Sequence, residues 1–367
     1  MKFTVTRSNL LQGVQTVYRS GQAKSGLPVL NTILFQVDSE KLTLTSSDID
    51  LTIQCRLPAN TESGGEICLP ARQILDIVRC LPDTPIQVEN SPETNSVKIL
   101  YDNSEINIKG YPPEHFPAPP ELTDFSSFEL PQGTLKEMIR QTIYAVSQDK
   151  TRPLFTGVFF EKYGGKLRLV ATDTHRLALR EADVEVGDFP GVIVPSGSLN
   201  ELTRIMRQEE EKVSVMIGRT HISFATADSV LISRLITGQF PAYQQIIPTS
   251  FSSSLVMNRE ELSSALARAS LLINEDLPIL RFNFSREESY IFLSAETGWI
   301  KEQLKASYEG EGMEIFFNAR YLIETLRVLS TEEVAISFTS PLSAAIIKPA
   351  GREDYLALLL PARPKSD

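Results

Sequence analysis

Apolar and polar residues alternate along this chain with two periods, one typical of strands and one typical of amphipathic helices. In six places a short strand-like run leads into a stripe with apolar residues three or four positions apart. Leu10, Val14 and Val17 form such a stripe, and Ile74, Leu75 and Val78 form another. We therefore expect six units of a strand followed by a helix, over residues 3–18, 66–81, 128–146, 192–207, 255–272 and 314–329.

These six units belong to a longer repeat. Pro28, Pro153 and Pro278 are spaced 125 residues apart, and each is followed by an apolar strand. A second strand is expected after each of them, over residues 41–53, 166–179 and 290–304. Proline-rich connectors, PPEHFPAPPELTDF and FPAYQQIIPTSF, lie where the repeat requires boundaries. The sequence predicts three domains of one kind, over residues 1–121, 122–249 and 250–367.

The repeat also predicts the fold class. Two helices and several strands in each copy favour an α+β fold, with three tandem copies of one helix-on-antiparallel-sheet domain. Sheets of this kind have open edges, which promote association unless they are covered or paired. A row of such domains can close head to tail into a ring or extend into a filament, and closure is the soluble outcome.

Charge is distributed unevenly. The chain of 367 residues has 36 Lys and Arg against 46 Asp and Glu, a net charge of −10, which alone argues against nucleic-acid binding. The predicted helices, however, carry twelve basic residues and six acidic ones, which leaves 24 basic and 40 acidic residues elsewhere. The basic residues are Arg7, Arg19, Arg72, Arg79, Lys136, Arg140, Arg204, Arg207, Arg259, Arg268, Arg320 and Arg327. If the helices share one surface, that surface attracts phosphate; the alternative is ordinary solvated helix faces of mixed charge.

The usual catalytic and metal-binding motifs are not found in the sequence. The sequence has no glycine-rich phosphate loop, no nucleophile elbow and no metal-spaced Cys and His set, so we expect neither a metal nor another cofactor. No apolar run reaches the roughly 18 residues of a membrane span, and the first residues do not resemble a signal peptide. Three cysteines without a CxxC pair, Cys55, Cys68 and Cys80, favour a reducing cytoplasm.

Several segments together resemble one known family. LPVLNTILF, SSDID, LPARQILDIVRCLPD, ATDTHRLAL, LISRLITGQFPAYQQIIP, FNARYLIETLRVL and YLALLLPARP occur in order over the whole chain. They resemble the bacterial replicative sliding clamps, the DNA polymerase III beta subunits. The resemblance implies a head-to-tail homodimer that closes a ring around duplex DNA. It implies a non-catalytic processivity factor whose partners are the polymerase, the clamp loader and other clamp-binding proteins, with no membrane.

The resemblance also implies binding residues. For a partner peptide, the matching positions are Phe155, Thr172, Thr174, His175, Arg176, Leu177, Pro241, Gln245, Ile246, Ser343, Leu358, Leu359, Leu360, Pro361, Ala362 and Arg363. Apolar Leu and Ile walls suit an extended peptide with Leu or Phe anchors, with His175 and Arg176 at the rim. Without the resemblance, we would interpret His175 and Arg176 as a satisfied pair at a strand end. Thr174, Gln245 and Ala362 depart from the Gly, Arg and Met that are usual in the family.

Two further surfaces follow from the same resemblance. Matching DNA-facing positions are Lys24, Arg72, Lys150 and Arg152. Dimer contacts are expected between an edge strand, Glu105, Ile106, Asn107, Ile108 and Lys109, and the third domain near Leu271, Leu272 and Ile273. Two other functions stay open from the residues alone. One is a metal-dependent nucleic-acid hydrolase built on tandem domains, and the other is a protein-interaction solenoid that needs neither DNA nor ring closure.

Overall fold

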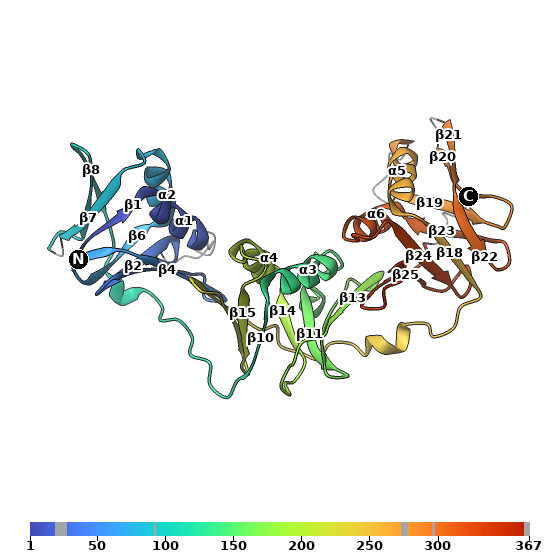
Figure 1. Ribbon diagram of the computed structural model, residues 1–367, viewed down its shortest axis with the longest axis horizontal. Coiled ribbons are helices and arrows are strands. Elements are labelled where there is room, and N and C mark those ends of the chain that lie inside the picture. Colours follow the sequence, from blue (N-terminus) through green and yellow to red (C-terminus); the bar gives the residue numbers. More distant parts are fainter. Residues whose placement is uncertain (19–27, 92, 273–277, 296–297, 363–367) are drawn as a thin grey trace. The chain divides into compact units, whose positions relative to one another are not determined.

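The computed structural model describes residues 1–18, 28–91, 93–272, 278–295 and 298–362. The chain divides into two compact units, and Figure 1 labels their helices and strands. Unit 1 comprises Met1–Thr134, Gly187–Phe189 and Gly197–Leu235. Unit 2 comprises Leu135–Val186, Pro190–Ser196 and Ile236–Asp367. No helix among the described residues is long and apolar enough to cross a membrane.

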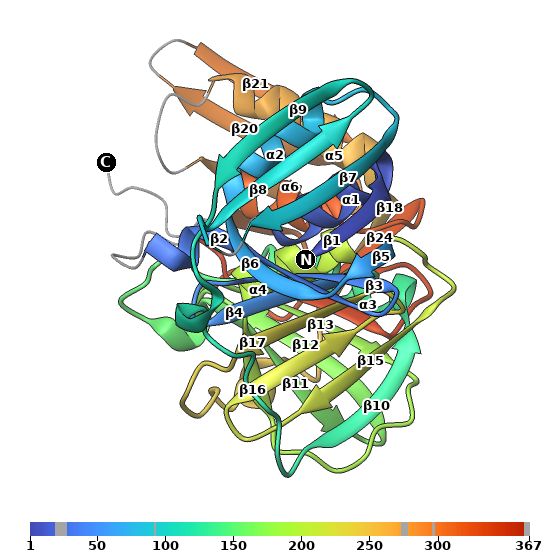
Figure 2. The ribbon, with the colours of Figure 1, turned by 90° about the vertical axis from the view of Figure 1, so that its left-hand side faces the viewer.

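Unit 1 contains two antiparallel sheets. One has five strands in the order β5-β1-β7-β8-β9, of which Figure 2 shows β7, β8 and β9 side by side. Its strands are β1 (Lys2–Thr6), β5 (Asn60–Ser63), β7 (Pro85–Ser91), β8 (Ser96–Tyr101) and β9 (Ser104–Lys109). The other has eight strands in the order β10-β15-β16-β17-β4-β3-β2-β6. These are β2 (Thr32–Asp38), β3 (Lys41–Ser47), β4 (Leu51–Pro58), β6 (Gly65–Pro70), β10 (Ser126–Pro131), β15 (Lys212–Ile217), β16 (His221–Ala225) and β17 (Ser229–Arg234).

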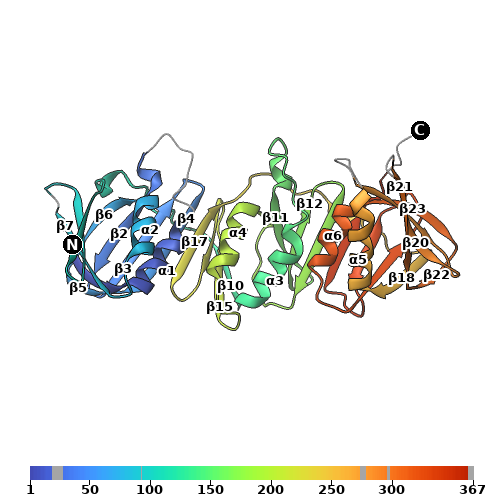
Figure 3. The ribbon, with the colours of Figure 1, turned by 90° about the horizontal axis from the view of Figure 1, so that it is seen from above.

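Helices α1 (Arg7–Val17) and α2 (Ala71–Cys80) lie side by side over the strands β2, β3, β4 and β6 (Figure 3). The Thr6 hydroxyl caps α1 by accepting a hydrogen bond from the Asn9 N–H at 3.3 Å, which satisfies one of the free donors of the first turn. The predicted stripes of both helices face the sheet and are buried. A Cβ at Gly13 of α1 would come within 2.5 Å of the Leu57 side chain, so a larger residue there would force that leucine to shift.

Unit 2 also contains two antiparallel sheets. The larger has nine strands in the order β14-β11-β12-β13-β26-β25-β24-β18-β22, and the smaller has four in the order β21-β20-β19-β23. The nine are β11 (Gly157–Tyr163), β12 (Lys166–Thr172), β13 (Arg176–Ala182), β14 (Val192–Pro195), β18 (Ser253–Asn258), β22 (Ala306–Glu309), β24 (Glu333–Phe338), β25 (Ala345–Pro349) and β26 (Tyr355–Leu359). The four are β19 (Ile279–Phe284), β20 (Ser289–Ala295), β21 (Gly298–Leu304) and β23 (Met313–Asn318).

Four further α-helices repeat the spacing of α1 and α2. They are α3 (Gln132–Ile143), α4 (Ser196–Ile205), α5 (Arg259–Ala269) and α6 (Ala319–Arg327), and α5 packs against α6 (Figure 3). Helix starts at residues 7, 132 and 259, and at 71, 196 and 319, confirm a repeat of about 125 residues. Of the twelve basic residues expected on helices, ten lie there, because Arg207 follows the end of α4 and Arg19 is outside the described residues.

The large sheets run across the predicted domain boundaries. Strand β4 pairs with β17, and β13 pairs with β26, so each sheet joins strands from two copies of the repeat. This explains why two compact units form from three repeated segments. The exact boundaries at residues 121 and 249 stay a prediction.

The expectation of a single second strand in each copy is wrong. Residues 41–53 and 166–179 each form two strands joined by a tight turn. The Asp48 carboxylate accepts a hydrogen bond from the Leu51 N–H at 2.8 Å, and the Asp173 carboxylate accepts one from the Arg176 N–H at 3.0 Å. Local acceptors of this kind favour a turn over a continuing strand.

Candidate functional site

Segments that are distant in the sequence meet at the junction of β13 and β26. Leu177 pairs with Leu358 across the two strands, and Ile346 of β25 pairs with Leu358 on its other side. Just beyond the strands, the Leu360 N–H donates a hydrogen bond to the His175 carbonyl at 2.9 Å. The ATDTHRLAL segment and the LLLPAR segment, both predicted to bind a partner peptide, are therefore adjacent.

An apolar floor lies under this junction. Val170, Leu177, Ile346 and Leu358 pack there with Phe240 and other buried side chains. Leu177 and Leu358 are 1% and 2% exposed, so they support the surface from below and do not form open walls. Leu359 is also buried, in the neighbouring core of the same unit. The apolar side chains that do reach the surface are Ile246, 55% exposed, and Leu360, 43% exposed.

The connector that carries Ile246 is tied to strands β11 and β12. The ring of Phe240 stacks on Phe159 with centroids 4.7 Å apart. The Tyr243 hydroxyl donates to Glu161 and accepts a hydrogen bond from Arg168 at 2.8 Å. Burial, together with the bond to Glu161, raises the pKa of Tyr243 well above its usual range, so the hydroxyl keeps its proton. These contacts hold the connector in place, with Pro241, Gln245 and Ile246 exposed.

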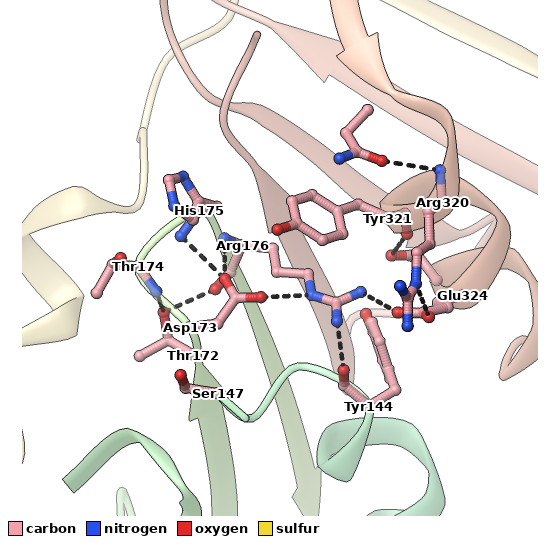
Figure 4. Close-up of polar contacts among 12 residues, drawn as sticks. Tyr144, Ser147, Thr172, Asp173, Thr174, His175, Arg176, Arg320, Tyr321 and Glu324 are labelled. Atoms are coloured by element: carbon pink, nitrogen blue, oxygen red, sulfur yellow. Dashed lines mark hydrogen bonds and ion pairs between the residues drawn. The ribbon is translucent and has the colours of Figure 1, made fainter. Parts of the chain in front are cut away.

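Arg176 does not lie at the rim as predicted, because it is only 8% exposed. Figure 4 shows its side chain among Asp173, Tyr144 and Glu324. Its Nε donates to Asp173 at 3.0 Å, one Nη donates to Glu324 at 2.5 Å, and the other donates to the Tyr144 carbonyl at 2.6 Å. The guanidinium also lies 4.4 Å from the centre of the Tyr321 ring. These groups satisfy all three nitrogens, so Arg176 joins the ATDTHRLAL turn to α6 and is not free to bind a ligand.

Glu324 of α6 completes this network. Although burial raises the pKa of Glu324, hydrogen bonds from Arg176 and Arg320 outweigh that effect and lower it below its ordinary value. The Arg320 Nε lies 3.0 Å from the other Glu324 oxygen. Sequence reasoning missed Tyr321 and Glu324, although Arg320, Glu324 and Arg327 follow one another at helical spacing on α6 and predict a polar stripe.

The other predicted peptide residues surround the same junction. Phe155 is half-buried beneath the Arg152 guanidinium, 4.8 Å from the centre of its ring, and the Thr172 hydroxyl donates to the Arg176 carbonyl at 2.6 Å. His175 is exposed and Ser343 is half-buried. Pro361 and Ala362 are half-buried, and the Ala362 N–H donates to the Phe316 carbonyl at 2.7 Å. Arg363 lies outside the described residues.

Thr174 has a φ of 79°, in the left-handed region that favours glycine and is uncommon for a β-branched residue. Ile49, at the matching turn of unit 1, has a φ of 83°. The departure from the family's glycine therefore places a strained residue beside His175. Replacing Thr174 by glycine removes the steric cost of the left-handed conformation, about 1–2 kcal/mol. The greater conformational freedom of glycine in the unfolded chain opposes folding by about 0.5–1 kcal/mol.

Thr174→Gly is therefore expected to raise the free energy of unfolding by about 0.5–1 kcal/mol in urea denaturation. Ile49→Gly is the matched variant in unit 1 and should act in the same direction. A lower free energy of unfolding for both glycine variants would contradict the assignment of strain to these turns.

A cleft of about 620 Å³ adjoins the junction. Its lining comes from the end of α3, the residues that follow it, the turn at residues 173–176 and α6. Of the predicted peptide residues, Thr174, His175 and Arg176 line it, and Arg152 of the predicted DNA surface lines it too. The exposed Ile246 and Leu360 are not part of its lining, so the cleft extends beyond the apolar surface that sequence reasoning identified.

The predicted DNA-facing residues are exposed where the structure describes them. Arg72 of α2 has 89% of its side chain exposed and lies 3.9 Å from the Asp76 carboxylate. Lys150 and Arg152 are exposed in the segment before β11. Lys24 lies outside the described residues. Long, solvated basic side chains of this kind can reach phosphate without reading bases.

The predicted dimer strand is an edge strand. Residues Glu105–Lys109 belong to β9, which pairs only with β8 in the five-stranded sheet. In unit 2, Leu271 is 79% exposed, Leu272 is half-buried, and Ile273 lies outside the described residues. Sequence reasoning expected a strand over residues 290–304 but did not identify its second half, β21, as a nearby edge strand. This strand carries Trp299, which is 68% exposed and stacked on Phe292. A single tryptophan in the chain was the available signal.

The geometry of the β13–β26 junction recurs in unit 1 with different side chains. The Arg234 N–H donates to the Asp50 carbonyl at 2.7 Å, as the Leu360 N–H does to His175. Strand pairing matches as well, with Thr52 opposite Ile232 and Ser223 opposite Ile232 on its other side. The floor differs, because buried Thr45, Thr52 and Ser223 stand where unit 2 has Val170, Leu177 and Ile346.

No group of three or more His, Cys, Asp or Glu side chains that could hold a metal ion occurs within the described part of the chain. The larger clusters of buried charge are committed to ion pairs, as at Arg168 with Glu181 and at Arg180 with Asp354. The described surfaces are suited to binding a partner by apolar contact and by charge.

Comparisons with known proteins cover nearly the whole chain. Models of the N-terminal, central and C-terminal domains of the DNA polymerase III beta subunit match residues 1–120, 129–242 and 244–363. The beta sliding clamp of Bacillus subtilis is 30% identical over 99% of this chain and 100% of its own length, and that of Pseudomonas aeruginosa is equally similar.

Solved structures agree with these relatives. The sliding clamp of Bacillus subtilis superposes with a TM-score of 0.95 at 30% identity, with 99% of each chain covered. A Pseudomonas aeruginosa clamp bound to griselimycin gives 0.95 at 30% identity, over 99% of this chain and 100% of that one. The predicted family and clamp fold are confirmed. The chain belongs to the DNA polymerase III beta subunit family, the sliding clamps of bacterial replication.

Proposed function

We propose that this chain is a sliding clamp that encircles duplex DNA as a homodimer and tethers replication and repair proteins through a peptide site in unit 2. The observation that carries this function is the convergence of the 172–177, 240–247 and 358–362 segments on one surface in a full-length member of the clamp family. Membership in that family makes the chain a processivity subunit and gives no support to the hydrolase or the solenoid. As a replication protein, it acts in the bacterial cytoplasm.

The peptide site uses apolar anchors. Ile246 and Leu360 supply exposed apolar area, and the buried Leu177 and Leu358 keep the surface beneath them rigid. A client segment with Leu and Phe anchors gains most of its affinity by burying those anchors. The replicative polymerase, the clamp loader and other proteins with such segments compete for one surface.

The DNA contacts are electrostatic. The described helices carry ten basic and six acidic residues, while the whole chain is net negative. Arg72, Lys150 and Arg152 are exposed and reach phosphates, which carry no sequence information. The ring slides because no contact depends on the bases.

Dimer formation pairs open edges. Strand β9 of one copy, with Glu105, Ile106, Asn107, Ile108 and Lys109, lies against the third domain of the other near Leu271 and Leu272. Edge strands gain main-chain hydrogen bonds when they pair, and apolar side chains beside them are buried at the same time. The exposed Trp299 on the edge strand β21 belongs to this surface.

Retention on DNA tests the ring. Once loaded, the protein is expected to stay on a nicked circular plasmid through gel filtration at 0.5 M salt and to leave when the plasmid is linearised. Leu271→Glu and Trp299→Glu, each expected to raise the dimer dissociation constant about 30-fold or more, should lose retention and sediment as monomers. Leu342→Glu, at a leucine that is 88% exposed outside the predicted interface, serves as the control.

Equal retention on circular and linear DNA would point to ordinary tight binding and would refute encirclement. Monomers of the wild-type protein at micromolar concentration would refute the dimer. If the wild type is retained on circular DNA and the two interface variants also stay dimeric, the assigned dimer edge is wrong but the ring is not refuted.

A further inference from the structure

The segment that carries Ile246 has little backbone attachment to the rest of unit 2. We call residues 237–249 the connector, and its regular structure is one 3₁₀ helix, η5 (Tyr243–Ile246). Among the described residues, each backbone hydrogen bond of the connector joins two connector residues, as the Tyr243 N–H and the Pro241 carbonyl do at 2.7 Å. The exposed Ile246 of the peptide site is therefore not held in place by strand pairing.

The side chain of Tyr243 makes the polar contact between the connector and the sheet. Within the part of the chain that the structure describes, the hydrogen bonds that leave the connector are those of its hydroxyl, which donates to Glu161 and accepts from Arg168 at 2.8 Å. Apolar contacts such as the stacked ring of Phe240 are also present. Apolar contact is non-directional, whereas a hydrogen bond requires a set distance and angle. Tyr243 therefore fixes where the connector lies on the sheet.

The two partners of Tyr243 belong to a row of charges across three strands. Glu161 of β11 pairs with Arg168 of β12, which pairs with Glu181 of β13. The Arg168 Nε donates to Glu181 at 2.7 Å, whereas an Arg168 Nη lies 3.7 Å from the Glu161 oxygen, beyond hydrogen-bond reach. The Tyr243 hydroxyl bridges that gap because it binds both groups.

This bridge favours the docked connector. The Glu161 side chain is only 16% exposed, so when the connector leaves the sheet this carboxylate loses a hydrogen bond where water has little access. Docking restores the bond and leaves Arg168 with a partner for each of its nitrogens. The row of charges therefore selects one position of the connector.

We propose that Arg168, Glu161 and Tyr243 are positioning residues of the peptide site, which hold Ile246 where an apolar anchor of a client can reach it. Arg168 and Tyr243 are 8% and 3% exposed, so they act on the peptide through Ile246, at the other end of the same 3₁₀ helix. This inference rests on the proposed peptide-binding function and adds to it residues that lie beneath the binding surface.

The central test removes the bridging hydroxyl from the full-length protein. Tyr243→Phe keeps the ring, which packs against Phe240, and removes both hydrogen bonds. If a peptide binds the docked connector, its apparent affinity falls with the docked population, and we expect a loss of about fivefold. Fluorescence anisotropy with a fluorescein-labelled peptide that has Leu and Phe anchors measures it. Hydrogen exchange over residues 240–247 should become faster in the same variant.

A double-mutant cycle separates positioning from a general loss of stability. In an Ile246→Ala background, Tyr243→Phe should change the affinity by less than about twofold, because the loss acts through Ile246. Glu161→Gln keeps an acceptor for the hydroxyl and should bind nearly as the wild type does, whereas Glu161→Ala should behave like Tyr243→Phe. Tyr308→Phe is the matched control. It removes a buried tyrosine hydroxyl that donates to the Glu311 carbonyl at the far edge of the nine-stranded sheet, and it should leave the affinity unchanged.

Unchanged affinity in Tyr243→Phe would overturn the inference while peptide binding itself stands. An equal loss in Tyr308→Phe would overturn it too, because the effect would then follow stability and not position. A full loss from Tyr243→Phe in the Ile246→Ala background would show that Tyr243 does not act through Ile246, and the inference would be wrong. If the wild-type protein does not bind the peptide, the proposed peptide function fails and this inference fails with it.

Discussion

Arg176→Met is expected to lower the free energy of unfolding by about 3–5 kcal/mol, the usual cost of removing one partner from a buried ion pair. Arg176 is 8% exposed and donates to Asp173, to Glu324 and to the Tyr144 carbonyl. Methionine fills similar volume but removes the cation that pairs with Asp173 and leaves Glu324 paired with Arg320 alone. Urea denaturation followed by circular dichroism measures the loss, and the fluorescence of Trp299, the only tryptophan in the chain, reports on unit 2.

Arg219→Met is the matched control, since its ion pair with Asp124 is exposed and should contribute less than about 1 kcal/mol. A similar small loss of stability for both variants would mean that the Arg176 network does not stabilise the fold as its geometry indicates.

Arg176→Met should also change how the stability of the protein responds to acid. The lowered pKa of Glu324 means that its ion pairs stabilise the fold fully above the ordinary value of 4.5, and that this contribution is lost as pH falls through the lower value in the folded state. Without Arg176 the pKa of Glu324 rises, so the loss of stability on acidification should begin at a higher pH.

The double variant Ile246→Asp with Leu360→Asp is expected to weaken binding of a Leu- and Phe-anchored peptide by 100-fold or more, from about 2 kcal/mol at each contact. Both side chains are exposed, so their replacement should not disturb the fold. Fluorescence anisotropy measures the affinity, and sedimentation confirms the dimer. Ile49→Asp, at an isoleucine that is 59% exposed in unit 1, should bind the peptide as the wild type does. Unchanged affinity in the double variant would place the partner site elsewhere.

Truncation gives a second test of the same surface, provided that it starts at the right residue. Leu359 pairs with Arg176 and with Ala345 and is buried, so a deletion that includes it cuts into the core. A deletion from Leu360 onward keeps strand β26 with its buried Leu359, and removes the exposed Leu360 and the half-buried Pro361 and Ala362. It should abolish peptide binding and leave the dimer intact.

The periodic parts of the fold could be predicted from the sequence because burial imposes their pattern. Stripes such as Leu10, Val14 and Val17 face the sheet, and a spacing of 125 residues recurs wherever the same core has to be built. The edge position of the strand at residues 105–109 was also predictable from its resemblance to the clamp family. The tight turns at Asp48 and Asp173 were not recognised, because apolar residues continue on both sides of them.

Features that depend on contacts between distant segments could not be predicted. A sequence shows Arg176 beside His175 but not Glu324 beneath it, so the histidine and the arginine received the same role although one is exposed and the other is buried. Leu177 and Leu358 were expected as walls because they are apolar, and only strand pairing shows that they form the floor. The cleft requires α3, the 173–176 turn and α6 to be brought together, which no local pattern reports.

The polar floor of the matching junction in unit 1 has a consequence for valency. The Thr45 hydroxyl accepts a hydrogen bond from the Gln54 side-chain amide at 3.3 Å, and the Thr52 hydroxyl lies 2.9 Å from the Ser47 hydroxyl. At the matching positions of unit 2, Val170 and Leu177 make apolar contacts. The duplicated junction therefore keeps the backbone pairing and loses the hydrophobic surface that an anchor needs. Of these two junctions, the β13–β26 junction of unit 2 is the one that can bind a client peptide. A homodimer therefore has two such peptide sites. Two clients bound to one ring are at high effective concentration with respect to each other, so one can bind the DNA when the other dissociates from it.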